Sequence, residues 1–207
     1  MGRIIAIANQ KGGVGKTTTA VNLSAALAAR GKKTLLVDMD PQGNTTSGLG
    51  LEKNELDKTT YEVITGEEKI QNCIVKDLFD NLSLLPANRN LAGAEIELMT
   101  VDKMQFIMKH NLEKVKKQYD FIIIDCMPSL GMMTINALAC ADSVLIPVQA
   151  AYLPVKGLQQ LIKTIGRVAL KEQDYDKYAR KMKKYLKWEL IILDDFLLHT
   201  ITDEREI

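Results

Sequence analysis

The sequence predicts an α/β fold, a doubly wound, mostly parallel β-sheet with helices on both faces. Short, continuously apolar segments alternate along the chain with segments whose apolar residues have helical spacing. Strands that are apolar along their whole length are typical of parallel sheets, because both faces of such sheets are buried. In addition, a glycine-rich turn or carboxylates directly follow several of these strands, and open α/β sheets bind ligands at that edge.

The elements are expected in alternating order. A strand over residues 4–8 is rich in β-branched side chains, and a helix over 17–30 follows it and stops at Gly31. Further strands are expected over 34–37, 82–85, 121–124 and 143–148, and further helices over 91–117 (one or two) and 154–170. Residues 43–60 and 66–77 are polar and should form surface loops or short elements. Right-handed crossovers between parallel strands then lead to the doubly wound sheet.

Composition excludes several classes of protein. With 46% hydrophobic and 26% charged residues, the chain is neither disordered nor fibrous. A net charge of +1 gives no overall attraction to nucleic acid. Cys73, Cys126 and Cys140 are scattered and form no CxxC pair, which favours a reducing compartment. The first residues lack the features of a signal peptide, and no apolar run reaches the ~18–20 residues that span a bilayer, so a soluble cytoplasmic protein is expected.

A candidate phosphate-binding loop lies between the first strand and the first helix. It reads Lys11, Gly12, Gly13, Val14, Gly15, Lys16, Thr17 and Thr18. The strict phosphate-loop pattern requires a glycine where Gln10 stands, but three glycines still allow backbone N–H groups to converge on an anion. Lys16 would contact the β- and γ-phosphates, and the Thr17 hydroxyl would bind Mg²⁺. The alternative is a glycine-rich strand-to-helix turn that binds no ligand.

Carboxylates follow two other strands. Asp38 and Asp40 come after the strand at 34–37, and Asp125 ends the strand at 121–124. Carboxylates and a polyphosphate are both negatively charged, so their proximity indicates that Mg²⁺ or a positioned water is also present. Asp125 is expected to hold Mg²⁺ directly or through water, or alternatively to cap the next helix. Asp38 could equally support a neighbouring residue or act as a cap.

Residues 11–18 resemble the deviant Walker A motif of the ParA/MinD family of P-loop ATPases, and the resemblance extends over about residues 3–166. It is nearest to the ParA/Soj partition ATPases. The resemblance implies ATP and Mg²⁺ as cofactors, with residues 11–18 binding the nucleotide and Thr17 and Asp125 binding the metal. It implies that Lys11 reaches the phosphates bound by the partner subunit, although a solvated loop lysine is the alternative. Lys16 would stabilise the γ-phosphate, and Asp40 would orient the attacking water.

The function implied by this resemblance is that of an ATP hydrolase in chromosome or plasmid partition. It would form a homodimer with ATP, hydrolyse it slowly and be stimulated by a centromere-binding ParB-like partner. Residues 126–131 resemble the switch II of the family, but Met127 replaces its first proline, which should loosen the loop. Cys126 and Cys140 lack the glycine-rich surroundings of a related iron-protein family, so no cluster is expected.

Residues 167–207 depart from the family pattern and are expected to form an atypical tail packed on domain 1–166. They resemble part of the IstB-type transposition-helper ATPases, around a strand at 190–193 that could join the sheet. Asp194 and Asp195 would be caps or solvated groups, and the adenine side of the pocket remains unspecified. A basic run could contact DNA non-specifically or form a solvated helix face; it comprises Lys177, Arg180, Lys181, Lys183, Lys184 and Lys187. The predominantly acidic stretch 203–206 argues against membrane binding.

Three other functions stay open at this point. The chain could bind nucleotide without significant hydrolysis, because Met127 and the tail alter the switch regions. It could be an IstB-like transposition helper, or a poorly folding mosaic without activity.

Overall fold

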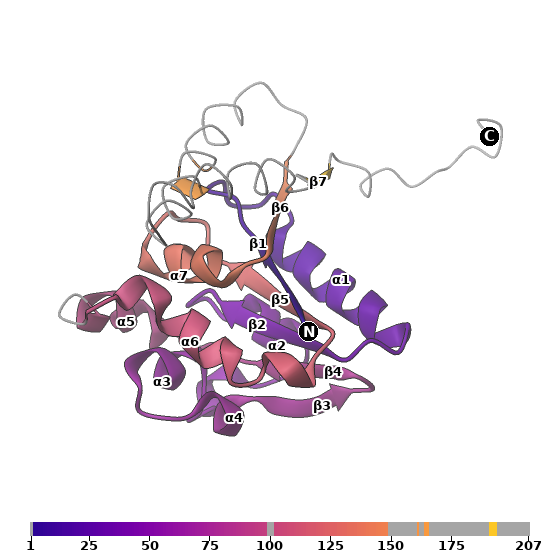
Figure 1. The fold of residues 1–207 in the computed structure, drawn as a ribbon, viewed down its shortest axis with the longest axis horizontal. Helices are drawn as coiled ribbons and strands as arrows, with labels where there is room; N and C mark the ends of the chain where they lie inside the picture. Colours follow the sequence, from indigo (N-terminus) through magenta and orange to yellow (C-terminus); the bar gives the residue numbers. More distant parts are fainter. Residues whose placement is uncertain (1, 99–101, 149–160, 162–163, 166–190, 194–207) are drawn as a thin grey trace, which may run out of the picture.

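The computed structural model describes residues 2–98, 102–148, 161, 164–165 and 191–193 (Figure 1). Its strands are β1 (Arg3–Ile7), β2 (Thr34–Met39), β3 (Val75–Phe79), β4 (Leu82–Leu85), β5 (Phe121–Cys126), β6 (Ser143–Pro147) and β7 (Ile191–Leu193). Its α-helices are α1 (Lys16–Ala29), α2 (Asn44–Gly48), α3 (Thr60–Thr65), α4 (Ile70–Cys73), α5 (Leu91–Glu97), α6 (Ile107–Glu113) and α7 (Met132–Cys140). The 3₁₀ turns are η1 (Lys53–Glu55), η3 (Met104–Phe106) and η4 (Lys116–Gln118).

The strands form one sheet in the order β3-β4-β2-β5-β1-β6-β7. All neighbouring pairs are parallel except β3 with β4. The doubly wound, mostly parallel sheet expected from the sequence is therefore confirmed. The strand expected at 190–193 is also confirmed, because β7 pairs in parallel with β6 and extends that side of the sheet.

Successive residues of the central strands point to opposite faces, and each face has its own hydrophobic core. On one face, Ile7, Leu36 and Ile123 pack with Ala20 and Ala28 of α1. On the other face, alternate residues of the same strands pack with a larger cluster that includes residues of α3, α5, α6 and α7. Figure 1 shows α1 on one side of the sheet and α5, α6 and α7 on the other. Both faces of the central strands are thus buried, which explains their continuously apolar sequences.

Some segments differ from the sequence expectation. Within the described residues, the region expected to be helical at 91–117 includes the short α-helices α5 and α6 and the 3₁₀ turns η3 and η4. The polar region that ends at 77 leads into β3, an antiparallel edge strand whose Lys76, Asp77 and Phe79 are exposed and whose register is irregular. Its sequence is polar because only one face of this edge strand meets the protein. Most of the helix expected over 154–170 and most of the tail at 167–207 lie outside the described residues; within 154–170 the structure describes residues 161 and 164–165, which are helical.

No helix in the described part of the chain is long and apolar enough to cross a membrane.

The topology gathers the predicted site residues at one edge of the sheet. The phosphate-binding loop follows β1, Asp40 follows β2, and Asp125 lies near the end of β5. In the parallel register, Asp125 is the partner of Ile7 on one side and of Asp38 on the other. Because β5 lies between β1 and β2, residues distant in sequence converge there.

Candidate functional site

The loop between β1 and α1 leaves open space above its backbone. Gly13 and Gly15 have φ angles of 71° and 84°, in the left-handed region that favours glycine. A Cβ atom placed on Gly12, Gly13 or Gly15 would meet no atom of the described residues within 4 Å. Among the described residues, no side chain caps the N-terminus of α1, and its first turn contains no acidic residue. The positive end of the helix dipole therefore faces the loop, an arrangement that suits an anion.

Asn9 holds the start of this loop, a role that sequence analysis missed. Its side-chain amide donates to the Pro147 carbonyl at 2.6 Å, and its Oδ1 accepts from the Lys11 N–H at 3.0 Å. Asn9 is buried, and it connects the phosphate-binding loop to the end of β6. Only the pairing of β1 with β6 brings Pro147 near, so no local sequence pattern could have indicated this contact.

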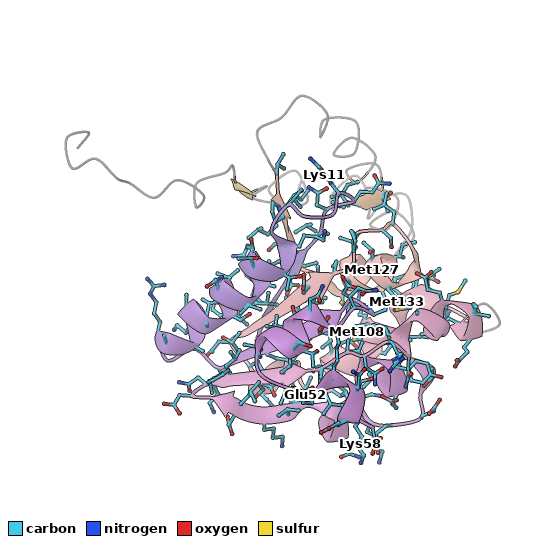
Figure 2. All side chains as sticks on the ribbon, turned by 180° about the vertical axis from the view of Figure 1, so that it is seen from behind. Lys11, Glu52, Lys58, Met108, Met127 and Met133 are labelled. Carbon is cyan, nitrogen blue, oxygen red and sulfur yellow. The ribbon has the colours of Figure 1, made fainter. Side chains whose placement is uncertain are left out.

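Lys16 is buried at the start of α1, whereas Lys11 is exposed on the loop. The Lys16 ammonium group donates to the Lys11 carbonyl oxygen at 2.9 Å. Burial lowers the pKa of Lys16, and the nearby Asp125 and Asp40 carboxylates oppose that shift. An anion in the loop would stabilise the charge of this partly desolvated ammonium group. In Figure 2, Lys11 lies on the loop at the edge of the molecule, near the end of β1.

Asp125 is almost completely buried, and among the described residues only one of its carboxylate oxygens accepts hydrogen bonds. Its Oδ2 accepts from the Thr17 hydroxyl at 2.8 Å and from the Thr45 hydroxyl at 2.7 Å. Its Oδ1 is buried without a hydrogen-bond partner in the described part of the protein. Burial raises the pKa of Asp125, while the hydrogen bonds from Thr45 and Thr17 oppose that shift. A buried carboxylate oxygen without a donor is costly unless a cation or water binds it.

Asp38 is buried, and its hydrogen bonds fit both alternatives that the sequence left open, support of a neighbouring residue and a cap. Its Oδ1 accepts from the Asp40 N–H at 3.1 Å. Its Oδ2 accepts from both the N–H and the hydroxyl of Thr46, at 2.9 and 2.7 Å. Burial raises the pKa of Asp38 to about 7. Asp38 therefore holds both α2 and the backbone of Asp40 in place.

Asp40 is nearly buried, and its Oδ1 accepts from the Gln42 N–H at 2.9 Å. This bond and the contact of its own N–H with Asp38 fix the orientation of the Asp40 carboxylate. Its negative charge acts on Lys16 and on Asp125, so the three groups belong to one electrostatic site.

Met127, which replaces a proline of the resembled family, is half-buried and packs against the core. Its carbonyl oxygen accepts from the Ser129 N–H at 2.9 Å, so a local turn forms here without the missing proline. That core cluster includes Met133 of α7, and Figure 2 labels both residues. The neighbouring Cys126 is a buried free thiol, as are Cys73 and Cys140.

The site residues fit a magnesium-bound polyphosphate better than a metal held by protein ligands alone. In the described ranges, no group of three or more His, Cys, Asp or Glu side chains could hold a metal ion. Mg²⁺ is usually bound by one or two protein groups, substrate phosphates and waters. The Thr17 hydroxyl and the unpaired Oδ1 of Asp125 supply such groups beside an open anion-binding loop.

Comparison with known families and sequences agrees with this geometry. A family model described as an AAA domain matches residues 2–177. The sporulation initiation inhibitor protein Soj of Bacillus subtilis (strain 168) is 48% identical over 205 residues, which cover 99% of this chain and 75% of that protein. The chromosome partitioning protein ParA of Myxococcus xanthus (strain DK1622) is 51% identical over 168 residues, 81% of this chain and 59% of that protein. The chain thus spans about three fifths to three quarters of these two relatives.

Two solved structures extend the similarity to three dimensions. Cobyrinic acid a,c-diamide synthase from Mycobacterium smegmatis, with bound ATP analog and magnesium, has a TM-score of 0.78 and 41% identity. That comparison covers 82% of this chain and 67% of the synthase chain. A plasmid partition protein from Borrelia burgdorferi has a TM-score of 0.75 and 28% identity, covering 93% of this chain and 88% of that one. None of these comparisons tests the resemblance of residues 167–207 to the IstB-type helpers, which stays a prediction.

Proposed function

Since this chain belongs to the family of the Soj and ParA partition ATPases, we propose that it acts in chromosome or plasmid partition as a nucleotide-dependent dimer switch. Its cofactors are ATP and Mg²⁺, as in a ParA-like P-loop ATPase. The observation that carries the proposal is the open glycine loop beside Lys16, Thr17 and the unpaired Oδ1 of Asp125.

The residue roles in this proposal follow from charge and position. The backbone N–H groups of residues 11–18 and the Lys16 ammonium group bind the β- and γ-phosphates, where negative charge gathers. Thr17 and Asp125 hold Mg²⁺, which neutralises phosphate charge when it is bound. Asp40, whose carboxylate is oriented by the Gln42 N–H, positions the attacking water. Lys11 is exposed on the loop, and the resemblance to the ParA/MinD family implies that it reaches the nucleotide of a second subunit.

The partners in this proposal are a second copy of the chain when ATP is bound, and a ParB-like centromere-binding protein. Non-specific DNA is a further candidate, through the basic residues 177–187, which lie outside the described residues. We propose the cytoplasm as the location. The slow intrinsic hydrolysis expected of such a switch lets the ATP-bound state persist until the partner protein triggers it.

Calorimetric titration of Mg²⁺–ATP tests the binding step. Wild-type protein is expected to bind, and Lys16→Ala should weaken affinity by about 100-fold, because a charge-assisted contact with two phosphates is lost. Lys32→Ala is the matched control, since Lys32 is exposed in the turn after α1 and should leave affinity unchanged. Equal affinities of wild-type protein and Lys16→Ala would contradict the assignment of this loop.

Hydrolysis is measured separately with Asp40→Ala. This variant is expected to keep nucleotide binding and to lose turnover. If wild-type protein binds ATP without measurable turnover, and Asp40→Ala changes nothing, the chain is a nucleotide-binding module rather than an ATPase.

A further inference from the structure

We propose that Thr45 is a positioning residue of the magnesium site, which holds the Asp125 carboxylate so that Oδ1 is presented to the cation. The inference rests on the proposed function, because it concerns the same Mg²⁺-dependent nucleotide site. Thr45 lies outside the phosphate-binding loop and follows the Asp40 segment by five residues, so its role is visible only in the fold.

The first step is the asymmetry of the Asp125 hydrogen bonds. Both donors, the Thr17 and Thr45 hydroxyls, contact Oδ2, at 2.8 and 2.7 Å, whereas Oδ1 has no partner in the described structure. Two donors on one oxygen fix the rotation of the carboxylate and leave the other oxygen for a ligand. Thr45 is fully buried, so water does not compete for its hydroxyl proton.

The second step is that the two donors have different tasks. Thr17 belongs to α1 and supplies a hydroxyl oxygen to the cation in the proposed site, so its geometry depends on the ligand. Thr45 belongs to α2 and donates its single hydroxyl proton to Asp125. It can therefore keep the carboxylate oriented both before and after the cation binds.

The third step is that α2 is anchored independently of the nucleotide. Thr46, the next residue, binds the Asp38 carboxylate through its N–H and hydroxyl, and its Oγ1 accepts from the Ala87 N–H at 2.9 Å. Asp38 and Asp125 are register partners on β2 and β5. Two consecutive threonines thus bind two carboxylates on adjacent strands, and the anchoring by Thr46 places Thr45 against Asp125.

The experiment compares ADP affinity with Mg²⁺ and with a chelator in its place, by calorimetry on the full chain. The ratio of the two affinities isolates the contribution of the metal. Thr45→Val, which keeps the shape but removes the hydroxyl, should lower this ratio by about tenfold, as loss of a group that orients a metal ligand typically does. Its affinity for ADP without Mg²⁺ should be unchanged. Thr45→Ser, which restores the hydroxyl, should return the ratio to the wild-type value.

The matched control is Thr60→Val. Thr60 is also fully buried, but its hydroxyl donates to the carbonyl oxygens of Asp38 and Pro86 rather than to Asp125. This variant should lose stability without changing the Mg²⁺ ratio. Circular dichroism establishes that each variant is folded, and Thr45→Ala serves as a second deletion of the hydroxyl if Thr45→Val does not fold.

The outcomes distinguish the role of Thr45 from the existence of the magnesium site. A wild-type ratio in Thr45→Val, or an equal loss in Thr60→Val, would overturn the role of Thr45 while leaving the magnesium site intact. A wild-type protein that binds ADP equally with and without Mg²⁺ would overturn both the proposed metal site and the role of Thr45.

Discussion

At the scale of single residues, the site depends on carboxylates that the fold has removed from water. Asp38 and Asp125 are almost inaccessible, yet each accepts hydrogen bonds from threonine hydroxyls. Burial disfavours the charged form of both, so the pKa of each carboxyl is raised. The protein therefore keeps groups at the candidate site that cost stability when they ionise, which is common where function selects the residue.

This cost predicts a pH dependence of stability. The pKa of Asp38 is about 7 in the folded protein, well above its value in the unfolded chain. Between about pH 4 and pH 7 the native state retains a proton that the unfolded state has lost. The stabilisation that this proton gives to the native state is fully present below about pH 4 and is lost as pH rises towards 7. The free energy of unfolding should therefore fall by up to about 1.4 kcal/mol per pH unit in this range.

Urea unfolding across this range, without nucleotide, measures the effect. Asp38→Asn carries no titrating group at this position, so its free energy of unfolding should fall less steeply with pH than that of wild-type protein. Asp57→Asn, which changes an exposed aspartate, should follow the wild-type slope. Parallel curves for wild-type protein and Asp38→Asn would contradict the raised pKa.

At the scale of elements, one buried amide joins three helical segments on the face opposite α1. Asn136 of α7 is fully buried. Its Oδ1 accepts from the Met108 N–H at 3.1 Å, and its Nδ2 donates to the carbonyl oxygens of Met104 and Met132, at 2.9 and 3.1 Å. These bonds satisfy backbone groups at η3 and at the start of α6, where helical hydrogen bonding is incomplete. Short helices are marginal alone, so such contacts matter more here than helix propensity.

Asn136→Ala should therefore lower the free energy of unfolding by about 2–4 kcal/mol, because buried backbone groups lose their partners and a small cavity forms. Asn72→Ala is the control: Asn72 is exposed, and its amide binds Glu68 at 2.8 Å, so its loss should cost within about 0.5 kcal/mol. Both values come from urea denaturation at one pH. Similar shifts for the two variants would show that Asn136 does not connect these elements.

At the scale of the whole molecule, the three cysteines all lie in one of the two cores, so their reactivity measures the opening of that core. Cys73, Cys126 and Cys140 are buried in the cluster opposite α1, and none forms a disulfide. Burial raises the pKa of Cys73 to about 11 and that of Cys140 to about 12, so little thiolate is present near neutral pH.

Labelling with a thiol reagent should therefore be slow in native buffer and should accelerate for all three cysteines together as urea unfolds the protein. Ala25→Cys, at an exposed position of α1, supplies the fast control. Mass spectrometry after proteolysis assigns the rate to each cysteine. Rapid native labelling of one cysteine alone would indicate that its part of the core opens independently.

Most of the fold was accessible from the sequence, because the relevant signals are local. The strand at 82–85 was predicted with its observed bounds, and the other central strands within one or two residues, since strands buried on both faces must be continuously apolar. Residues 11–18 lie together because they are contiguous: residues 11–15 form the loop after β1, and residues 16–18 begin α1. Edge strand β3 was missed, because its side chains are at most half-buried and its sequence lacks that signal.

The sequence by itself determined the parallel sheet, the glycine loop and the placement of Asp40 and Asp125 at strand ends. Only the tertiary structure decided that Thr45 contacts Asp125, that Thr46 clamps Asp38, and that Asn9 reaches Pro147. These contacts depend on which strands are neighbours and in what register, and β2 and β5 are neighbours although about eighty residues separate them. Periodicity and motifs describe what one segment does alone, whereas hydrogen bonds between distant segments arise only after the whole sheet has assembled.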